Sequence, residues 1–190
     1  CVPSCISSPI MLENVQALHR AKNHQKQGAE ILGLYMEGPF YNPKYNGGTP
    51  IQYFQEPTLD KAIAFYEAAG GDLLSMGLAP ELPGAMDVIA LLSAKGVRMG
   101  IAHTGADYQQ TIAAIDAGCR MATHSFNAMR SLHHREVGVS GAILLDQRIY
   151  NEINCDFIHV CPPMIEILLK MKPQDKILMM TDNDSMTGMP

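Results

Sequence analysis

Short apolar runs alternate along the chain with segments of helical periodicity. Two such runs near the middle predict strands, and each is followed directly by a histidine: 97–102 by His103, and 119–123 by His124. The segment between them predicts a helix that Asp107 caps, with Gln110 as the reciprocal partner, and that Gly118 ends. Strands joined by a helix run parallel, so their carboxyl ends lie on the same side of the sheet. We therefore expect the two imidazoles to lie close together.

The same alternation continues on both sides of this unit. Further strands are predicted at residues 1–6, 31–36, 72–79, 150–153 and 176–181. Further helices are predicted at residues 8–28, 58–69, 86–94 and 162–172. Residues 38–57 and 130–141 are expected to be irregular, and the chain after the strand at 150–153 is expected to continue as an extended piece to His159.

Seven strand signals separated by helices or crossovers indicate an α/β fold. We predict a (β/α)8 TIM-type barrel that is incomplete here, lacking its first strand and its C-terminal part. Residues 1–190 would form a single domain, and the start at Cys-Val-Pro-Ser-Cys, without an initiator Met, predicts a piece of a longer protein. A doubly wound open sheet is the alternative, which the lack of a glycine-rich phosphate turn after the first strand disfavours.

Composition narrows the function classes without choosing one. The 190 residues are 47% hydrophobic and 17% charged, which is typical of a globular domain with a sizeable core. A net charge of -5 and the lack of a basic run argue against nucleic acid as a partner, and no apolar run is long enough to span a membrane. The five cysteines form no CxxC pair, so we expect reduced thiols and a cytoplasmic protein.

Polar residues follow five of the apolar runs, where barrel enzymes place their catalytic groups: Glu37, His103, His124, His159 and Asp182. A glutamate with two histidines is a ligand set for a divalent ion, with zinc or another first-row metal such as iron as the candidate. Asp182 is a candidate general base for the water that such a metal activates. Asp184 is its rival, and only the strand register favours Asp182.

The residues around these positions resemble a known family. The shared sequence motifs are EGPF at 37–40 with NPK at 42–44, APE at 79–81, AHT at 102–104, THSFNAM at 123–129, HRE at 134–136, IHV at 158–160 and TD at 181–182. They occur in family order across nearly the whole chain. On this basis the chain is similar to the N-acetylglucosamine-6-phosphate deacetylase family of the amidohydrolase superfamily.

The resemblance implies a role for each matching position. The metal would be held by Glu37, His103 and His124, and Asp182 would activate water and then protonate the leaving amine. Substrate contacts would come from Gly48, Asn127, Ala128, Arg135, Asp156, Phe157, Ile158 and His159, with the planar, permanently charged Arg135 on the phosphate. The family also implies a homodimer, since a neighbouring subunit binds part of the sugar phosphate. The implied reaction is hydrolysis of N-acetylglucosamine 6-phosphate to glucosamine 6-phosphate and acetate in amino-sugar catabolism.

Several positions depart from the family pattern. Gly47-Gly48-Thr49 stands where the family usually has Gly-Ala-His, Val137 replaces a proline, Phe157 a glycine and Asn183 an alanine. These departures leave the metal ligands intact and leave the identity of the sugar open. The number of metal ions, one or two, also stays open because the first barrel strand is expected to be absent.

Two other interpretations stay open. One is an amidohydrolase that acts on another N-acyl or cyclic amide substrate, for which Arg135 would not be needed. In that case Arg135 could instead form an exposed ion pair with Glu136, which contributes little to stability. The other is a truncated barrel without catalytic activity.

Overall fold

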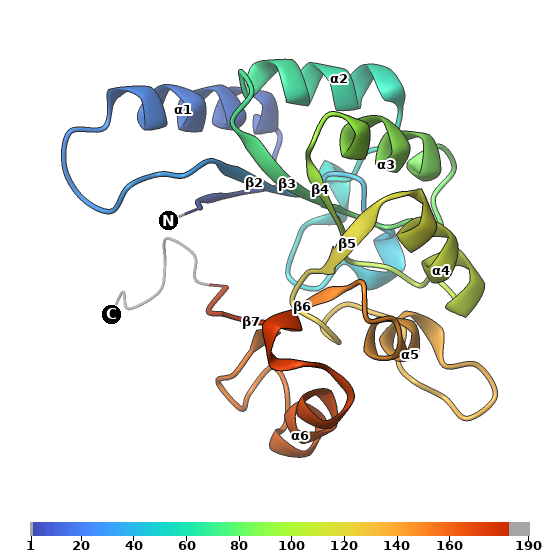
Figure 1. Ribbon diagram of the computed structural model, residues 1–190. Helices are drawn as coiled ribbons and strands as arrows, with labels where there is room; N and C mark the ends of the chain where they lie inside the picture. Colours follow the sequence, from blue (N-terminus) through green and yellow to red (C-terminus); the bar gives the residue numbers. More distant parts are fainter. Residues whose placement is uncertain (1, 183–190) are drawn as a thin grey trace.

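The computed structural model describes residues 2–182, which contain one parallel sheet of seven strands (Figure 1). The strands are β1 (Ser4–Ile6), β2 (Leu34–Glu37), β3 (Leu73–Leu78), β4 (Arg98–Ile101), β5 (Cys119–Ala122), β6 (Tyr150–Asn154) and β7 (Ile177–Met180). Their order in the sheet is their order in the sequence, and every neighbouring pair is parallel. Within the described residues β1 does not pair with β7, so the sheet is a curved, open part of a barrel. The predicted α/β architecture with seven parallel strands is confirmed.

Helices cover the outer side of the curved sheet (Figure 1). They are α1 (Met11–His24), α2 (Leu59–Ala68), α3 (Ala85–Ala94), α4 (Tyr108–Ala117), α5 (Gly138–Leu145) and α6 (Pro162–Met171), with the short 3-10 helices η1 (Pro43–Tyr45), η2 (Ile51–Tyr53) and η3 (Gln174–Lys176). Each α-helix packs against the next one along the chain. Among residues 2–182, none of the helices combines the length and the apolar character that crossing a membrane requires.

Helix α4, between the two histidines, begins as predicted. Asp107 Oδ1 accepts a hydrogen bond from the Gln110 backbone N–H at 2.8 Å, and Gln110 Oε1 accepts one from the Asp107 N–H at 3.0 Å. This reciprocal pair is a capping box, which satisfies two backbone donors that the helix itself leaves without partners. Gly118, at φ 133°, ends the helix and leads directly into β5.

Two local expectations were wrong. Residues 130–141 were expected to be irregular, but α5 begins at Gly138. Its sequence GVSGAILL is buried along seven of its eight residues, so it lacks the separate apolar and polar faces by which a helix is recognised in a sequence. The chain from Asn154 to His159 was expected to be extended, but Asp156 Oδ1 accepts hydrogen bonds from the Ile158 and His159 N–H groups, both at 2.9 Å. That turn places His159 five residues beyond β6 rather than at the strand end.

The core lies between the sheet and the helices. The larger cluster joins side chains of β1 to β5 with those of α1 to α5, including the fully buried Met76, Met99 and Ile101. A smaller cluster lies beneath α6 and joins Ile153 to Leu168. Because parallel strands are covered by helices on their outer face, these short apolar segments are held in register, and the residues that follow them are held at one end of the sheet.

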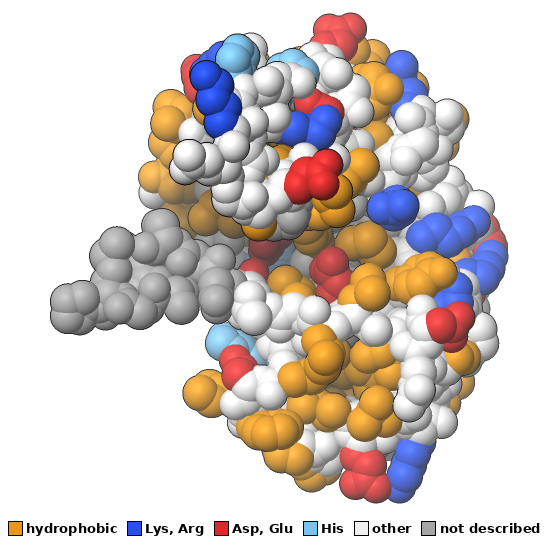
Figure 2. All heavy atoms as spheres, turned by 60° about the vertical axis from the view of Figure 1, so that its left-hand side comes forward, with side chains coloured by type: hydrophobic (Ala, Val, Ile, Leu, Met, Phe, Trp, Pro, Cys, Tyr) orange, Lys and Arg blue, Asp and Glu red, His pale blue; other side chains and the backbone are white. Residues whose placement is uncertain are grey.

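The two edges of the sheet border one cavity of about 850 Å³. Its lining includes residues 2–4 at β1, residues 179–182 at β7 and the acidic side chains Glu37, Glu152 and Asp156. Figure 2 looks toward this opening, where acidic side chains lie in the hollow between the two halves of the molecule. The strand ends therefore open into a polar, acidic space.

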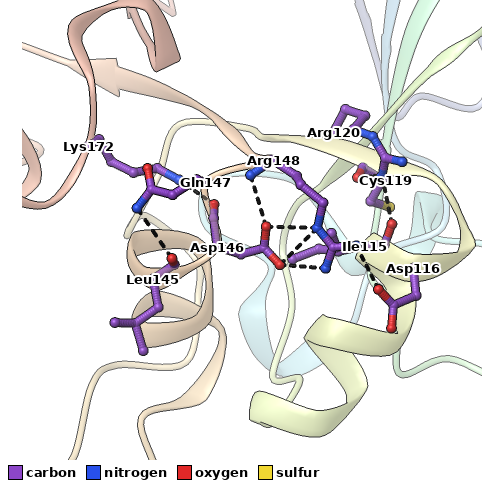
Figure 3. A network of polar contacts seen from close by, with 9 residues as sticks. All are labelled: Ile115, Asp116, Cys119, Arg120, Leu145, Asp146, Gln147, Arg148 and Lys172. Atoms are coloured by element: carbon purple, nitrogen blue, oxygen red, sulfur yellow. Dashed lines mark hydrogen bonds and ion pairs between the residues drawn. The ribbon is translucent and has the colours of Figure 1, made fainter.

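The opposite end of the sheet is held by a polar network (Figure 3). Arg148 precedes β6, and its guanidinium donates to Asp116 Oδ1 at 2.7 Å and to Asp146 Oδ2 at 2.6 Å, which joins α4 to the segment after α5. Lys172 Nζ donates to the Asp146 carbonyl at 2.5 Å. Lys172 is only 4% exposed, and its burial lowers the pKa of the ammonium to about 8. This end of a barrel typically serves stability rather than catalysis.

Candidate metal centre

Three ligating side chains meet at the carboxyl ends of β2, β4 and β5. Glu37 is the last residue of β2, while His103 and His124 come two residues after β4 and β5 end. The Nε2 atoms of the two histidines lie 3.1 Å apart. Glu37 Oε1 lies 3.5 Å from the Nε2 atom of His103 and 3.4 Å from that of His124. The expectation that the two imidazoles lie close together is confirmed, and Glu37 completes a buried triad.

The spacing of the three ligand atoms fits a divalent ion. Bonds of about 2.1 Å in tetrahedral zinc coordination hold neighbouring ligand atoms about 3.4 Å apart, which matches the separations within the triad. All three atoms lie within 4.8 Å of one another, and no other group of three His, Cys, Asp or Glu in the described part of the chain offers this geometry. One carboxylate and two imidazoles are also the donor types that such ions prefer.

Both histidines adopt backbone conformations that a histidine seldom adopts. The φ angle is 45° at His103 and 32° at His124, close to the left-handed region. A residue remains there only when its surroundings fix it, and such residues cluster at functional sites. The sharp turn after each strand directs the imidazole across the end of the sheet instead of outward.

Two tyrosines from the long segment after β2 hold His103 in place. Its Nδ1–H donates a hydrogen bond to the Tyr45 carbonyl at 2.8 Å, which orients Nε2, the other ring nitrogen, toward Glu37 and His124. The Tyr41 ring stacks on the imidazole with centroids 4.1 Å apart and an angle of 21° between the ring planes. The sequence predicts an irregular segment at residues 38–57, but no sequence pattern singles out either tyrosine.

Glu37 and His124 shift each other's pKa values toward the charged forms. Burial acts to raise the pKa of Glu37, but the hydrogen bonds from His103 and His124 outweigh it and lower that pKa to about 2. Burial acts to lower the pKa of His124, but the hydrogen bond to Glu37 and its negative charge outweigh it, so the pKa of His124 is raised. Glu37 is therefore ionised near neutral pH. A metal that takes the Nε2 atom of His124 must displace a proton when that imidazole is charged.

Asp182 stands two residues after β7 and lines the same cavity as Glu37. Partial burial raises the pKa of Asp182, the negative charge of Glu37 raises it further, and the nearby histidines oppose this shift. Its φ of 54° is again left-handed. Asp184, the other candidate general base, lies outside the described residues.

Two of the expected substrate contacts, Asn127 and Ala128, lie beside the histidines, and a third, Gly48, follows a glycine that does. Gly48 is exposed and follows Gly47, where an added Cβ would come within 3.2 Å of the His103 ring and 3.6 Å of the Ala128 Cβ. The Asn127 backbone N–H donates to the His124 carbonyl at 3.0 Å, and the Ala128 carbonyl accepts from the Thr104 N–H at 3.0 Å. The segments that carry Gly48, Asn127 and Ala128 are thus packed around the two histidines.

The loop after β6 holds four more of the expected contacts. Asp156 lines the cavity, and its carboxylate also pairs with His159 Nδ1 at 2.5 Å. Phe157 and Ile158 are 64% and 85% exposed, and Phe157 has a φ of 63°. The structure places Asp156 at the cavity that Glu37 and Asp182 line, while Phe157 and Ile158 point into solvent.

Arg135 lies on a short hairpin, where His133 and Glu136 exchange backbone hydrogen bonds at 3.2 and 3.1 Å. Its side chain is exposed. The Glu136 carboxylate accepts from the Tyr108 N–H at 3.2 Å and the Gly138 N–H at 2.9 Å, and in the part of the chain described it forms no ion pair with Arg135. The guanidinium is therefore not neutralised by its sequence neighbour.

The chain is 38% identical over 171 residues to the N-acetylglucosamine-6-phosphate deacetylase of Vibrio furnissii, an alignment that covers 90% of this chain and 43% of the relative. It is 33% identical to the N-acetylgalactosamine-6-phosphate deacetylase of Escherichia coli O157:H7, with 100% of this chain and 50% of the relative covered. The resemblance to these deacetylases is confirmed. The chain spans about half the length of the curated relatives it matches. No protein-family model matches it.

A solved structure extends the similarity to the fold. A mutant N-acetyl-D-glucosamine-6-phosphate deacetylase from Mycobacterium smegmatis, in complex with N-acetyl-D-glucosamine-6-phosphate, superposes with a TM-score of 0.93 at 31% sequence identity. The match covers 100% of this chain and 49% of that protein. The open sheet described above is therefore similar to one part of a deacetylase fold.

Proposed function

We propose that this chain carries the metal centre of a deacetylase that removes the N-acetyl group of an amino-sugar phosphate in amino-sugar catabolism. The proposed reaction converts N-acetylglucosamine 6-phosphate to glucosamine 6-phosphate and acetate. The observation that carries the proposal is the convergence of Glu37, His103 and His124, whose ligand atoms lie within 4.8 Å of one another at the carboxyl ends of three strands. The similarity to deacetylases over 90% of the chain supplies the reaction class.

The proposed cofactor is a divalent ion, with zinc favoured and iron as the alternative, held by Glu37, His103 and His124. Such an ion, when bound, polarises a carbonyl oxygen and lowers the pKa of water. The protein's own part is to keep the ligands ready. The Tyr45 carbonyl fixes the His103 tautomer at 2.8 Å, and Glu37 is ionised because the two histidines lower its pKa to about 2.

Asp182 is the proposed proton carrier. It opens into the same cavity as Glu37 and Glu152, on the side of the site that β7 forms. In the proposed reaction its carboxylate accepts the proton of the attacking water and delivers it to the nitrogen of the leaving amine, so that the C–N bond breaks without forming an amide anion.

The proposed substrate contacts come from the loops that follow β2, β5 and β6. Gly48, Asn127 and Ala128, whose segments pack around the two histidines, would contact the substrate, while Asp156 to His159 would line the sugar site. Arg135 would bind the phosphate through charge-assisted, bidentate hydrogen bonds, which suits an exposed guanidinium with no neutralising contact from Glu136. The alternative, an amidohydrolase acting on an N-acyl or cyclic amide without phosphate, leaves Arg135 without a role.

Three features of the complete protein belong to the same proposal. A further strand between β1 and β7 would close the sheet into a (β/α)8 barrel, because these two edges border one cavity. A homodimer would let a neighbouring subunit reach the sugar phosphate. A cytoplasmic location fits the free thiols of Cys5, Cys119, Cys155 and Cys161.

Acetate release by the full-length protein tests the proposal. N-acetylglucosamine 6-phosphate and N-acetylgalactosamine 6-phosphate would be compared, because relatives of both kinds align with this chain. Release from either phosphorylated sugar, abolished by a chelator and restored by a divalent ion, is the expected result. Release only from amides that lack phosphate would favour the alternative. No metal-dependent release from any amide would support the non-catalytic interpretation.

A further inference from the structure

Glu81, in the loop between β3 and α3, receives three hydrogen bonds from two other loops. Asn42 Nδ2 donates to Oε1 at 2.8 Å, the Gly105 N–H donates to Oε1 at 2.6 Å, and Thr104 Oγ1 donates to Oε2 at 2.5 Å. One partly buried carboxylate thereby joins the loops that follow β2, β3 and β4. Hydrogen bonds to an ionised acceptor are short and strong, as these are.

The three donors surround the backbone of His103. Thr104 and Gly105 are the two residues that follow it. From the other side, the Asn42 backbone N–H donates to the His103 carbonyl at 3.1 Å, so Asn42 contacts both Glu81 and the histidine segment. The carboxylate therefore clamps the chain immediately after this ligand, and it does so without touching the imidazole.

The backbone of His103 needs such a clamp. At φ 45° it adopts a conformation that costs a non-glycine residue free energy and that relaxes unless several contacts fix it. Tyr41 and Tyr45 contact the imidazole ring of His103. They do not fix the position of its Cα atom, which depends on the turn. A rotation of that turn would move Nε2 away from Glu37 and His124.

We propose that Glu81 is a positioning residue of the metal centre. It fixes the turn from His103 to Gly105 so that the Nε2 atom of His103 faces the other two ligands. This inference rests on the proposed function, because it takes the triad of Glu37, His103 and His124 to be a metal site. It assigns to Glu81 no contact with the substrate or with the metal.

The three groups that face the carboxylate donate to it, and two of them, Asn42 Nδ2 and the Gly105 N–H, can only donate. A glutamine of the same shape lacks the negative charge that strengthens all three hydrogen bonds. Its NH2 group would also either face these two donors or replace the acceptor that the Thr104 hydroxyl uses. Glu81→Gln therefore weakens the contacts that hold the turn with almost no change in volume.

The chain offers a matched control at Glu136. Like Glu81, this loop glutamate joins two segments by accepting hydrogen bonds. Its donors are the backbone N–H groups of Tyr108 and Gly138, at 3.2 and 2.9 Å. It has no hydrogen bond to His103, His124 or Glu37 in the described part of the chain. Glu136→Gln thus makes the same chemical change at a carboxylate whose two donors are not adjacent to any ligand of the triad.

The test is Co²⁺ binding by the metal-free, full-length protein, followed through the visible absorption of the bound ion, with the fold checked by circular dichroism. We expect Glu81→Gln to bind Co²⁺ about 10–100-fold more weakly than the parent and to show an altered absorption band. Glu136→Gln is expected to match the parent in both respects. Equal affinity and an equal band for Glu81→Gln and the parent would overturn the inference, and so would an equal loss in Glu136→Gln.

A second pair of variants applies if Glu81→Gln does not fold. Thr104→Val removes the donor to Glu81 and also the acceptor of the Ala106 N–H, while Thr104→Ser keeps both. Weaker Co²⁺ binding by the valine variant, restored by serine, supports the role of Glu81, whereas equal binding by the two overturns it. The variant His103→Ala tests the metal centre separately. If it binds Co²⁺ as tightly as the parent does, the proposed metal centre is wrong, whereas a failure of the Glu81 inference alone leaves the loss of binding in His103→Ala intact.

Discussion

Lys172 is a buried cation whose removal should make the protein more stable at neutral pH. Its side chain is 4% exposed, its Nζ atom contacts the Asp146 carbonyl, and burial lowers its pKa to about 8 (Figure 3). Against about 10.4 in the unfolded chain, this corresponds to about 3 kcal/mol. Below pH 8 both states carry the proton, so the folded state bears this full penalty.

The sign of the pH dependence follows from the two pKa values. Between pH 8 and about 10.4 the unfolded chain binds more protons at Lys172 than the folded protein does, so the stability contribution of this residue rises with pH. Lys172→Met removes the charge and loses one hydrogen bond, worth about 1 kcal/mol. The variant should therefore be about 2 kcal/mol more stable than the parent at pH 7 and about 1 kcal/mol less stable at about pH 10.5.

Urea unfolding of the full-length protein at a series of pH values measures this difference. Other groups that titrate in the same window, such as Cys and Tyr, cancel because they are shared by the parent and the variant. Lys170→Met is the control, since Lys170 is exposed in the last turn of α6, just before Lys172, and within residues 2–182 its ion pair is with Glu166; its effect should stay within about 0.5 kcal/mol at every pH. A difference between Lys172→Met and the parent that does not change between pH 8 and 10.5 would refute the reasoning.

Three further substitutions test the site and the fold. Asp182→Asn in the full-length protein should keep the metal and lose about 10²–10⁴-fold in kcat, because general acid–base catalysis contributes about that much; near-normal turnover would move the role to another group, first Asp184. Arg135→Ala should lower kcat/KM for the phosphorylated amino sugar and leave the unphosphorylated N-acetyl sugar almost unaffected, and equal losses on both would mean a structural role. Asp107→Ala should destabilise the protein by about 1 kcal/mol in urea unfolding without changing metal content, since it removes only a helix cap.

The parts of the fold that follow local rules could be predicted from the sequence. The capping box of α4, the threonine cap of α2 and the prolines that open α6 each leave a signal within a few residues. α5 leaves none, because a helix buried on nearly all sides shows no amphipathic period and its two glycines weaken its propensity. The turn at Asp156 was missed for a related reason. A single carboxylate that accepts two backbone donors looks, in the sequence, like any polar residue after a strand.

The candidate site divides in the same way. Glu37, His103 and His124 could be brought together by topology alone, because parallel strands present their carboxyl ends at one side of the sheet. The residues that orient them could not. The contacts of Tyr41, Tyr45 and the Glu81 carboxylate depend on how an irregular loop folds over the sheet, and no periodic pattern encodes that path.

The central claim is that Glu37, His103 and His124 hold a divalent ion, and elemental analysis of the purified full-length protein tests it most directly. The parent should contain at least one divalent ion per chain after extensive dialysis. A variant with both His103→Ala and His124→Ala, folded by circular dichroism, should contain almost none, because it leaves Glu37 as the only ligand of the three. Stoichiometric metal that survives in this double variant would contradict the assignment.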